Sequence, residues 1–198
     1  MLSFVLAFVI LTIYNYKHQK RLFKIMHYRE INHYILGYGV MLYLLIMLKE
    51  IIGFPSLSNW QRVLNVQGNI FDPNISFIPF GTGILHSDYL NILMFVPLGF
   101  LLPLMWSKYH SFKETLKYAF FLSLFIELSQ LFTRFRATDI NDLITNTFGA
   151  VIGWLFYLAV SKWLLEKVKP IPLFQASHFF SFEPKMYVLI AAICSFMS

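Results

Sequence analysis

Acidic and carboxamide side chains gather in the stretch IELSQLFTRFRATDINDLITNTFGAVIG. Glu127 and Gln130 lie three residues apart in an apolar run, so on a helix they share one face. Farther along, spacings of three and four residues place Asp139, Asp142 and Asn146 on one face of a second helix. Carboxylates in different surroundings can act as general acid and base, and amides can bind hydroxyl groups. This polar set could therefore catalyse a reaction or bind a polar ligand.

Asn91 and Arg136 complete the candidate site. Asn91 follows Asp88 by three residues where another apolar segment begins, and Arg136 is a counter-charge for Glu127 or an aspartate. An ionisable group inside a membrane-spanning helix costs about 2.5–3.5 kcal/mol, so such groups normally face a bundle interior or a water-filled cavity. We therefore predict that these side chains converge. The candidate catalytic residues are Glu127, Asp139 and Asp142, and the candidate binding residues are Asn91, Gln130, Arg136 and Asn146.

Simpler interpretations of the same residues stay open. Asp139 and Asp142 could cap the second helix, because carboxylates suit the positive end of a helix dipole. Asn91 and Asn146 could serve as hydrogen-bonding links between helices. Glu127 is the hardest to explain by packing alone, because it lies among Ile, Leu and Phe side chains, where desolvation favours the neutral acid.

The composition is typical of a membrane protein. Hydrophobic residues make up 58% of the 198 residues and charged residues only 13%, whereas soluble domains average about 25% charged. The net charge of +6 is explained by basic loops on one side of a membrane, so we expect no nucleic-acid partner. The single cysteine, Cys194, cannot form a disulfide within the chain, and no Cys/His spacing indicates a metal or another cofactor.

Five or six apolar segments predict an all-α, polytopic transmembrane helical bundle. Crossing a membrane takes about 20 mostly apolar residues. Five segments are of roughly this length: 1–16, 31–52, 88–107, 118–133 and 143–165. The first has no basic start and no cleavage site, so we expect a retained helix rather than a signal peptide. A sixth segment, 186–198, would cover about 20 Å, which is less than a full crossing.

The distribution of basic residues predicts the orientation. Loops 17–30, 108–117 and 162–185 hold twelve of the sixteen lysines and arginines. These loops alternate along the chain, so they lie on one side, which the positive-inside rule makes the cytoplasmic side of a bacterial plasma membrane. The long loop 53–87 and the short loop 134–142 should then face outward.

The long outer loop combines turn-forming and apolar residues, most clearly in IPFGTG at 78–83. We expect it to lie against the membrane surface or to dip into it, with a short helix near 58–66 and Trp60 as an interfacial anchor. The chain then divides into an N-terminal membrane helix with a basic loop (1–30), a transmembrane domain (31–165) and a C-terminal tail with a short hydrophobic segment (166–198).

Three motifs lie in or beside the candidate site. They are Glu127-x-x-Gln130 with Arg136-x-x-Asp139-x-x-Asp142-x-x-x-Asn146-x-x-Gly149-x-x-x-Gly153, then Asn91-Ile-Leu-Met-Phe95-Val-Pro97-Leu-Gly99-Phe, and Ile78-Pro79-Phe80. Together they resemble the signature of VanZ-like membrane proteins, over about residues 75–165. One departure is Ser76, where the family often has asparagine.

The resemblance implies a role at the cell envelope. The family is named for a member of a glycopeptide-resistance cluster that lowers susceptibility to teicoplanin, a lipid-tailed antibiotic. Our leading hypothesis is an outward-facing polar pocket that meets membrane lipids and engages a lipid-linked cell-wall precursor, a glycolipid or a lipoglycopeptide.

Other classes of function stay open. The chain could be an intramembrane hydrolase or transferase that acts on a lipid headgroup or cell-wall precursor through Glu127 and Asp139 or Asp142. The polar residues could instead form a buried network that fixes helix packing, with the function in a partner protein. A transporter is a weaker hypothesis, because the inner halves of the predicted helices carry few polar residues.

Overall fold

Helices form at each of the predicted apolar segments. The computed structural model describes residues 2–22, 30–71, 75–81, 83–133, 138–167 and 182–197. These residues confirm the all-α class, and their helices divide between two compact units. Unit 1 is formed by residues 1–70 and 182–198, and unit 2 by residues 71–181.

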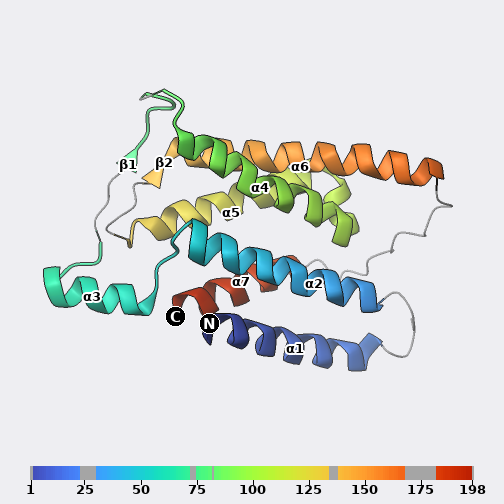
Figure 1. Ribbon diagram of the computed structural model, residues 1–198, viewed down its shortest axis with the longest axis horizontal. Coiled ribbons are helices and arrows are strands. Elements are labelled where there is room, and N and C mark those ends of the chain that lie inside the picture. Colours follow the sequence, from blue (N-terminus) through green and yellow to red (C-terminus); the bar gives the residue numbers. More distant parts are fainter. Residues whose placement is uncertain are drawn as a thin grey trace. The chain divides into compact units, whose positions relative to one another are not determined.

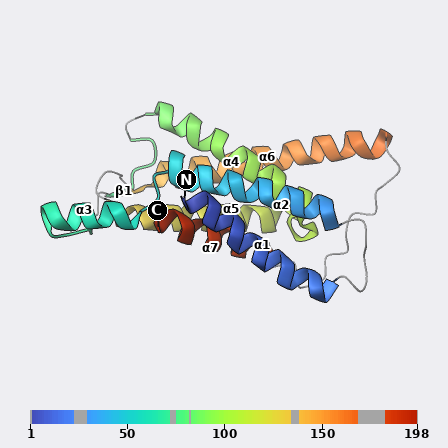
Figure 2. The ribbon, with the colours of Figure 1, turned by 60° about the horizontal axis from the view of Figure 1, so that its bottom comes forward.

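Unit 1 consists of packed helices and one further short helix. It contains α1 (Leu2–Leu22), α2 (Glu30–Leu45), η1 (Ile46–Ile51), α3 (Leu57–Gln67) and α7 (Glu183–Phe196). The helices α1, α2 and α7 pack side by side, and η1 continues α2 as a π-helix (Figure 1, Figure 2). The short helix predicted near 58–66 is confirmed as α3, which begins after the capping residue Ser56 and ends at Gln67, before the capping residue Gly68.

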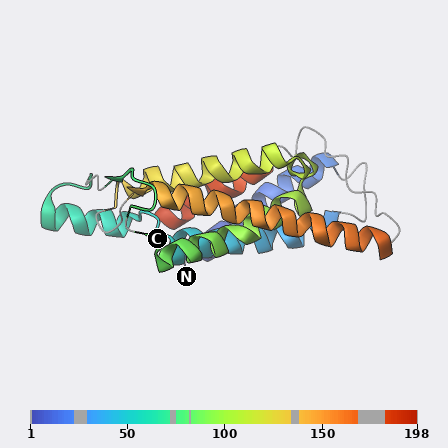
Figure 3. The same cartoon turned by 90° about the horizontal axis from the view of Figure 1, so that it is seen from above.

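Unit 2 contains the candidate site. Its elements are β1 (Ile75–Ser76), α4 (His86–Met105), η2 (Ser107–His110), α5 (Phe112–Gln130), β2 (Thr138–Asp139) and α6 (Ile140–Lys167). Seen from above, α6 lies between α4 and α5, and it contacts both (Figure 3). The first turns of α4 and α6 and the last turn of α5 lie at one end of unit 2, beside β1 and β2 (Figure 1).

Glycines bring α4 and α6 into backbone contact. A Cβ atom added at Gly149 or Gly153 of α6 would collide with a backbone oxygen of α4. A Cβ atom added at Gly99 of α4 would collide in the same way with the backbone of α6. Small residues at such spacing let helices approach closely in lipid, so these glycines serve the packing of α4 against α6.

Three helical stretches are long and apolar enough to cross a membrane. They are Tyr34–Ile51, His86–Met105 and Ile140–Lys162. Among the other described helices, α1 has a shorter apolar stretch, Ser3–Tyr16, and α5 carries charged residues at both ends. The helical bundle is therefore confirmed, whereas the total of five or six crossings stays a prediction.

Candidate functional site

One face of α5 carries the buried polar residues of the candidate site. Ser123, Glu127 and Gln130 follow one another at spacings of four and three residues, and all three are buried. Glu127 is only 3% exposed and Gln130 only 4% exposed. Burial of a polar group costs free energy unless it is hydrogen-bonded, so the partners of these residues decide what the site can do.

Glu127 is joined to the segment that leads into α6. One of its carboxylate oxygens, Oε2, accepts a hydrogen bond from the backbone N–H of Asp139 at 3.0 Å. The Thr138 hydroxyl donates to the backbone carbonyl of Glu127 at 3.1 Å. These two contacts hold the last turn of α5 against β2.

The two-residue strands bring the outer loop to the same place. β1 pairs with β2 in parallel, so Ile75 lies opposite Thr138 and Ser76 lies opposite Asp139. Strands were not predicted at either position. The pairing places Ser76, the position at which the sequence departs from the family pattern, directly beside the candidate site.

Three carboxylates converge at this end of unit 2. Both Asp142 and Asp139 interact electrostatically with Glu127. Asp139 also accepts the backbone N–H of Asn141 at 2.9 Å, so it caps the first turn of α6 as the simpler interpretation predicts. Glu127 is buried while the two aspartates are half-buried, so the carboxylates have the different surroundings that the sequence indicates.

Amides link the three helices around these carboxylates. The Asn91 amide on α4 donates to Asp142 on α6 at 2.6 Å. The Asn146 amide on α6 donates to the Ser123 hydroxyl on α5 at 3.0 Å. The predicted role of both asparagines as links between helices is thus visible in their contacts.

Several buried oxygens of the site nevertheless accept no hydrogen bond. Within the described segments, these atoms are Oε1 of Glu127, Oε1 of Gln130 and the amide oxygen of Asn146. A buried polar atom without a partner costs about 1–3 kcal/mol, so native proteins rarely keep several of them together. The amide oxygens of Gln130 and Asn146 are acceptors, and the Glu127 oxygen accepts when the carboxyl is ionised. Glu127 and Gln130 lie on the last two turns of α5, and the side chain of Asn146 on α6 contacts Ser123 in the same region. The site is therefore suited to a ligand or water that donates hydrogen bonds.

Asn141 is a buried residue of the site that the sequence pattern did not single out. Its side-chain oxygen accepts the backbone N–H of Phe80 at 2.7 Å, which ties the outer loop to the start of α6. Phe80 has a φ of 52°, a conformation that costs a non-glycine residue free energy and needs support from its surroundings. Asn141 lies off the predicted helical face, and its only signal in the sequence was an amide in the first turn of the helix.

Two further points concern the predicted counter-charge and the side chains that could bind a metal. Arg136, the predicted counter-charge, lies outside the described residues. In the segments that the structure describes, no group of three or more His, Cys, Asp or Glu side chains could hold a metal ion.

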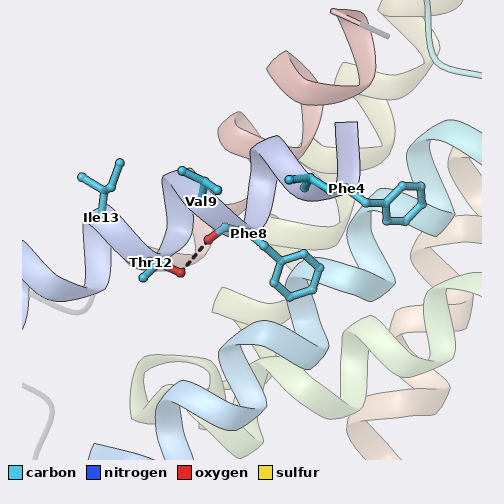
Figure 4. Close-up of a pocket in the computed structure, with 6 residues that line it drawn as sticks. Phe4, Phe8, Val9, Thr12 and Ile13 are labelled. Atoms are coloured by element: carbon cyan, nitrogen blue, oxygen red, sulfur yellow. Dashed lines mark hydrogen bonds between the residues drawn. The ribbon is translucent and has the colours of Figure 1, made fainter. Parts of the chain in front are cut away.

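An open, mostly apolar groove of about 460 Å³ lies in unit 1, where it is lined by residues of α1 (Figure 4). Its lining residues are Phe4, Val5, Phe8, Val9, Thr12 and Ile13, and none of them belongs to the candidate site. The hydroxyl of Thr12 donates to the carbonyl of Phe8 within the same helix, so the groove offers little polar recognition.

Comparisons with known proteins agree with the motifs. The sequence profile of the VanZ/LLP1 family matches residues 2–162, which include every candidate site residue. The chain is similar to Protein VanZ of Enterococcus faecium, with 29% identity over 134 residues, or 67% of this chain and 80% of that protein. No solved structure matches the chain.

Proposed function

Because the chain belongs to the VanZ/LLP1 family, we propose that it is a membrane protein that engages a lipid-tailed or lipid-linked molecule of the cell envelope. The proposed binding site is the polar set around Glu127 at the end of unit 2. The classes of ligand that we propose are a lipid-linked cell-wall precursor, a glycolipid or a lipoglycopeptide.

The observation that supports this proposal is the group of buried acceptors on Glu127, Gln130 and Asn146 that have no donor in the described segments. Sugars and peptides carry hydroxyl and N–H groups, which are the donors that such oxygens require. A lipid tail would let the ligand reach the site from the membrane, because the helices that hold the site carry exposed apolar side chains.

We further propose that the site faces outward in a bacterial plasma membrane. The loops rich in lysine and arginine would then be cytoplasmic, as the positive-inside rule predicts. In this orientation the site lies on the side where cell-wall precursors are used and where lipoglycopeptides arrive.

Drug susceptibility provides the functional test. Expression of the chain in a susceptible Gram-positive host should raise the inhibitory concentration of teicoplanin more than that of a glycopeptide without a lipid tail. Glu127→Gln should abolish most of the increase, because an amide can neither carry the charge of a carboxylate nor exchange a proton as a carboxyl group can.

Ser129→Ala is the matched control. Its hydroxyl bonds within α5, to the carbonyl of Ile126 at 2.6 Å, so its loss should leave susceptibility unchanged. Equal susceptibility of cells with the wild-type chain and with Glu127→Gln, at equal protein levels in the membrane, would remove the site from consideration.

An enzyme that hydrolyses or transfers a lipid headgroup is the alternative. The convergence of buried Glu127 with half-buried Asp139 and Asp142 favours it, because acid and base need different surroundings. Membrane lipids extracted from expressing cells should then contain a changed headgroup species that Glu127→Gln eliminates. A lipid composition that does not change on expression would favour binding over catalysis.

A further inference from the structure

The outer loop between β1 and α4 exposes large apolar side chains. Phe77 is 73% exposed, Ile78 is 72% exposed and Ile84 is 64% exposed. Leu85, at the start of α4, is exposed as well. Exposure of these four apolar side chains to water would be unfavourable, yet none of them is buried in the protein.

Polar contacts from the protein interior hold the backbone of this loop. Asn141, which is buried, accepts the N–H of Phe80 at 2.7 Å. Where the loop meets α4, the carboxylate of Asp88, which is also buried, accepts the N–H of Leu85 at 2.7 Å. The middle of the loop and its end at α4 are thus each held by a buried side chain.

Two tight turns, one that begins at Ile78 and one that begins at Phe80, shape the middle of this loop. The N–H of Gly81 donates to the carbonyl of Ile78 at 3.2 Å, and the N–H of Gly83 donates to that of Phe80 at 2.9 Å. Gly83 has a φ of 81° and Phe80 a φ of 52°, both in the left-handed region. The fold therefore supports an unfavourable backbone conformation while it leaves the apolar side chains exposed.

The apolar surface continues from the loop onto α4. Tyr89, Leu90 and Leu93, in the first two turns of α4, are exposed on the helix surface. The helix α4 is long and apolar enough to cross a membrane, and in such a crossing its exposed side chains would face lipid. The loop prolongs that apolar surface beyond the end of the helix.

We propose that the described residues 77–81 and 83–84 belong to a preformed loop that inserts Phe77, Ile78 and Ile84 among the acyl chains of the leaflet at this end of α4. The occupant of the apolar surface is membrane lipid, since the surface is continuous with a helix that faces lipid. The inserted loop is tied through Asn141 and Asp139 to Glu127, so it places the candidate site at the boundary between headgroups and acyl chains. This proposal does not require that the site bind a ligand or catalyse a reaction.

Depth-dependent quenching provides the test. The single cysteine, Cys194, is buried and would be replaced by alanine, and the full chain would carry an environment-sensitive fluorophore on Ile78→Cys or Ile84→Cys. The labelled protein would be reconstituted into vesicles of equal parts phosphatidylglycerol and phosphatidylcholine. We expect blue-shifted emission, strong loss of emission with nitroxide-labelled acyl chains, and little loss with aqueous iodide.

Lys113→Cys is the control variant, because Lys113 is exposed in the polar first turn of α5. It should show red-shifted emission that iodide quenches. Iodide quenching of both loop positions would overturn the proposal, and so would blue-shifted emission without nitroxide quenching, which would indicate a protein partner. The use of two loop positions preserves the test if one variant fails to elute from size exclusion as folded protein.

Discussion

The amide of Asn91 and the carboxylate of Asp142 form a 2.6 Å hydrogen bond between α4 and α6. Charge-assisted hydrogen bonds of this kind are stronger than those between neutral groups. The bond joins two helices whose glycines already bring their backbones into contact, so it fixes the end of the helix pair that holds the candidate site.

This hydrogen bond should appear as a coupling energy. We expect Asn91→Ala and Asp142→Ala each to lower the free energy of unfolding, and the double variant to lose less than the sum of the two. Contacting pairs usually couple by about 0.5–3 kcal/mol. Unfolding of the four proteins in detergent measures the coupling. Additive losses would show that the two side chains do not depend on each other.

The glycine contact between α4 and α6 should tolerate no side chain. Gly149→Ala and Gly153→Ala would each push a methyl group into the backbone of α4, and overpacking typically costs about 1–3 kcal/mol. Gly39→Ala in α2 is the matched control, because a Cβ atom there meets nothing within 4 Å. We expect a lower midpoint of thermal unfolding for the first two variants and an unchanged midpoint for the control.

Asn141→Ala should release the outer loop. The N–H of Phe80 would lose its acceptor, so its amide hydrogen should exchange faster with solvent while exchange in the middle of α6 is unchanged. Loss of one hydrogen bond of this type costs about 0.5–1.5 kcal/mol. Thr147→Ala is the control, because the Thr147 hydroxyl bonds only within α6, to the carbonyl of Leu143. Unchanged exchange at Phe80 would contradict the role assigned to Asn141.

Glu114 should give unit 2 a weak dependence of stability on pH. The hydrogen bond from Lys108, with the nearby Lys117, lowers the pKa of the Glu114 carboxyl below its usual value. A carboxyl whose pKa is lower in the folded state stabilises the fold above its unfolded pKa, which is about 4.3. That contribution disappears as the pH falls through the folded pKa.

The difference in unfolding midpoint between the wild type and Glu114→Gln should therefore shrink below about pH 4. High salt should shrink it as well, because the group is open to solvent. A difference that stayed constant with pH would assign the effect to packing.

Local patterns predicted the helices and the inner face of α5. Apolar length located α4 and α6, and the spacing of Glu127 and Gln130 correctly indicated one shared face, because helical periodicity is contained in neighbouring residues. Ser56 and Gly68, which cap the two ends of α3, are local signals as well.

The contacts that build the site were harder to predict because they join distant segments. The pairing of Ser76 with Asp139 spans more than sixty positions and involves only two residues of each strand, so it leaves no alternating pattern to detect. The bond between Phe80 and Asn141 is equally distant, and its acceptor lies off the polar face of α6. The number of membrane crossings also stays a prediction, because the charged residues of α5 make its composition ambiguous.

The backbone contact at Gly99, Gly149 and Gly153 has a mechanical consequence. At these three positions no side chain separates α4 from α6, so no rotamer change there can relieve a shift of one helix toward the other. The contact of α6 with α5 is of another kind, because there a hydrogen bond between the Asn146 amide and the Ser123 hydroxyl joins the two helices.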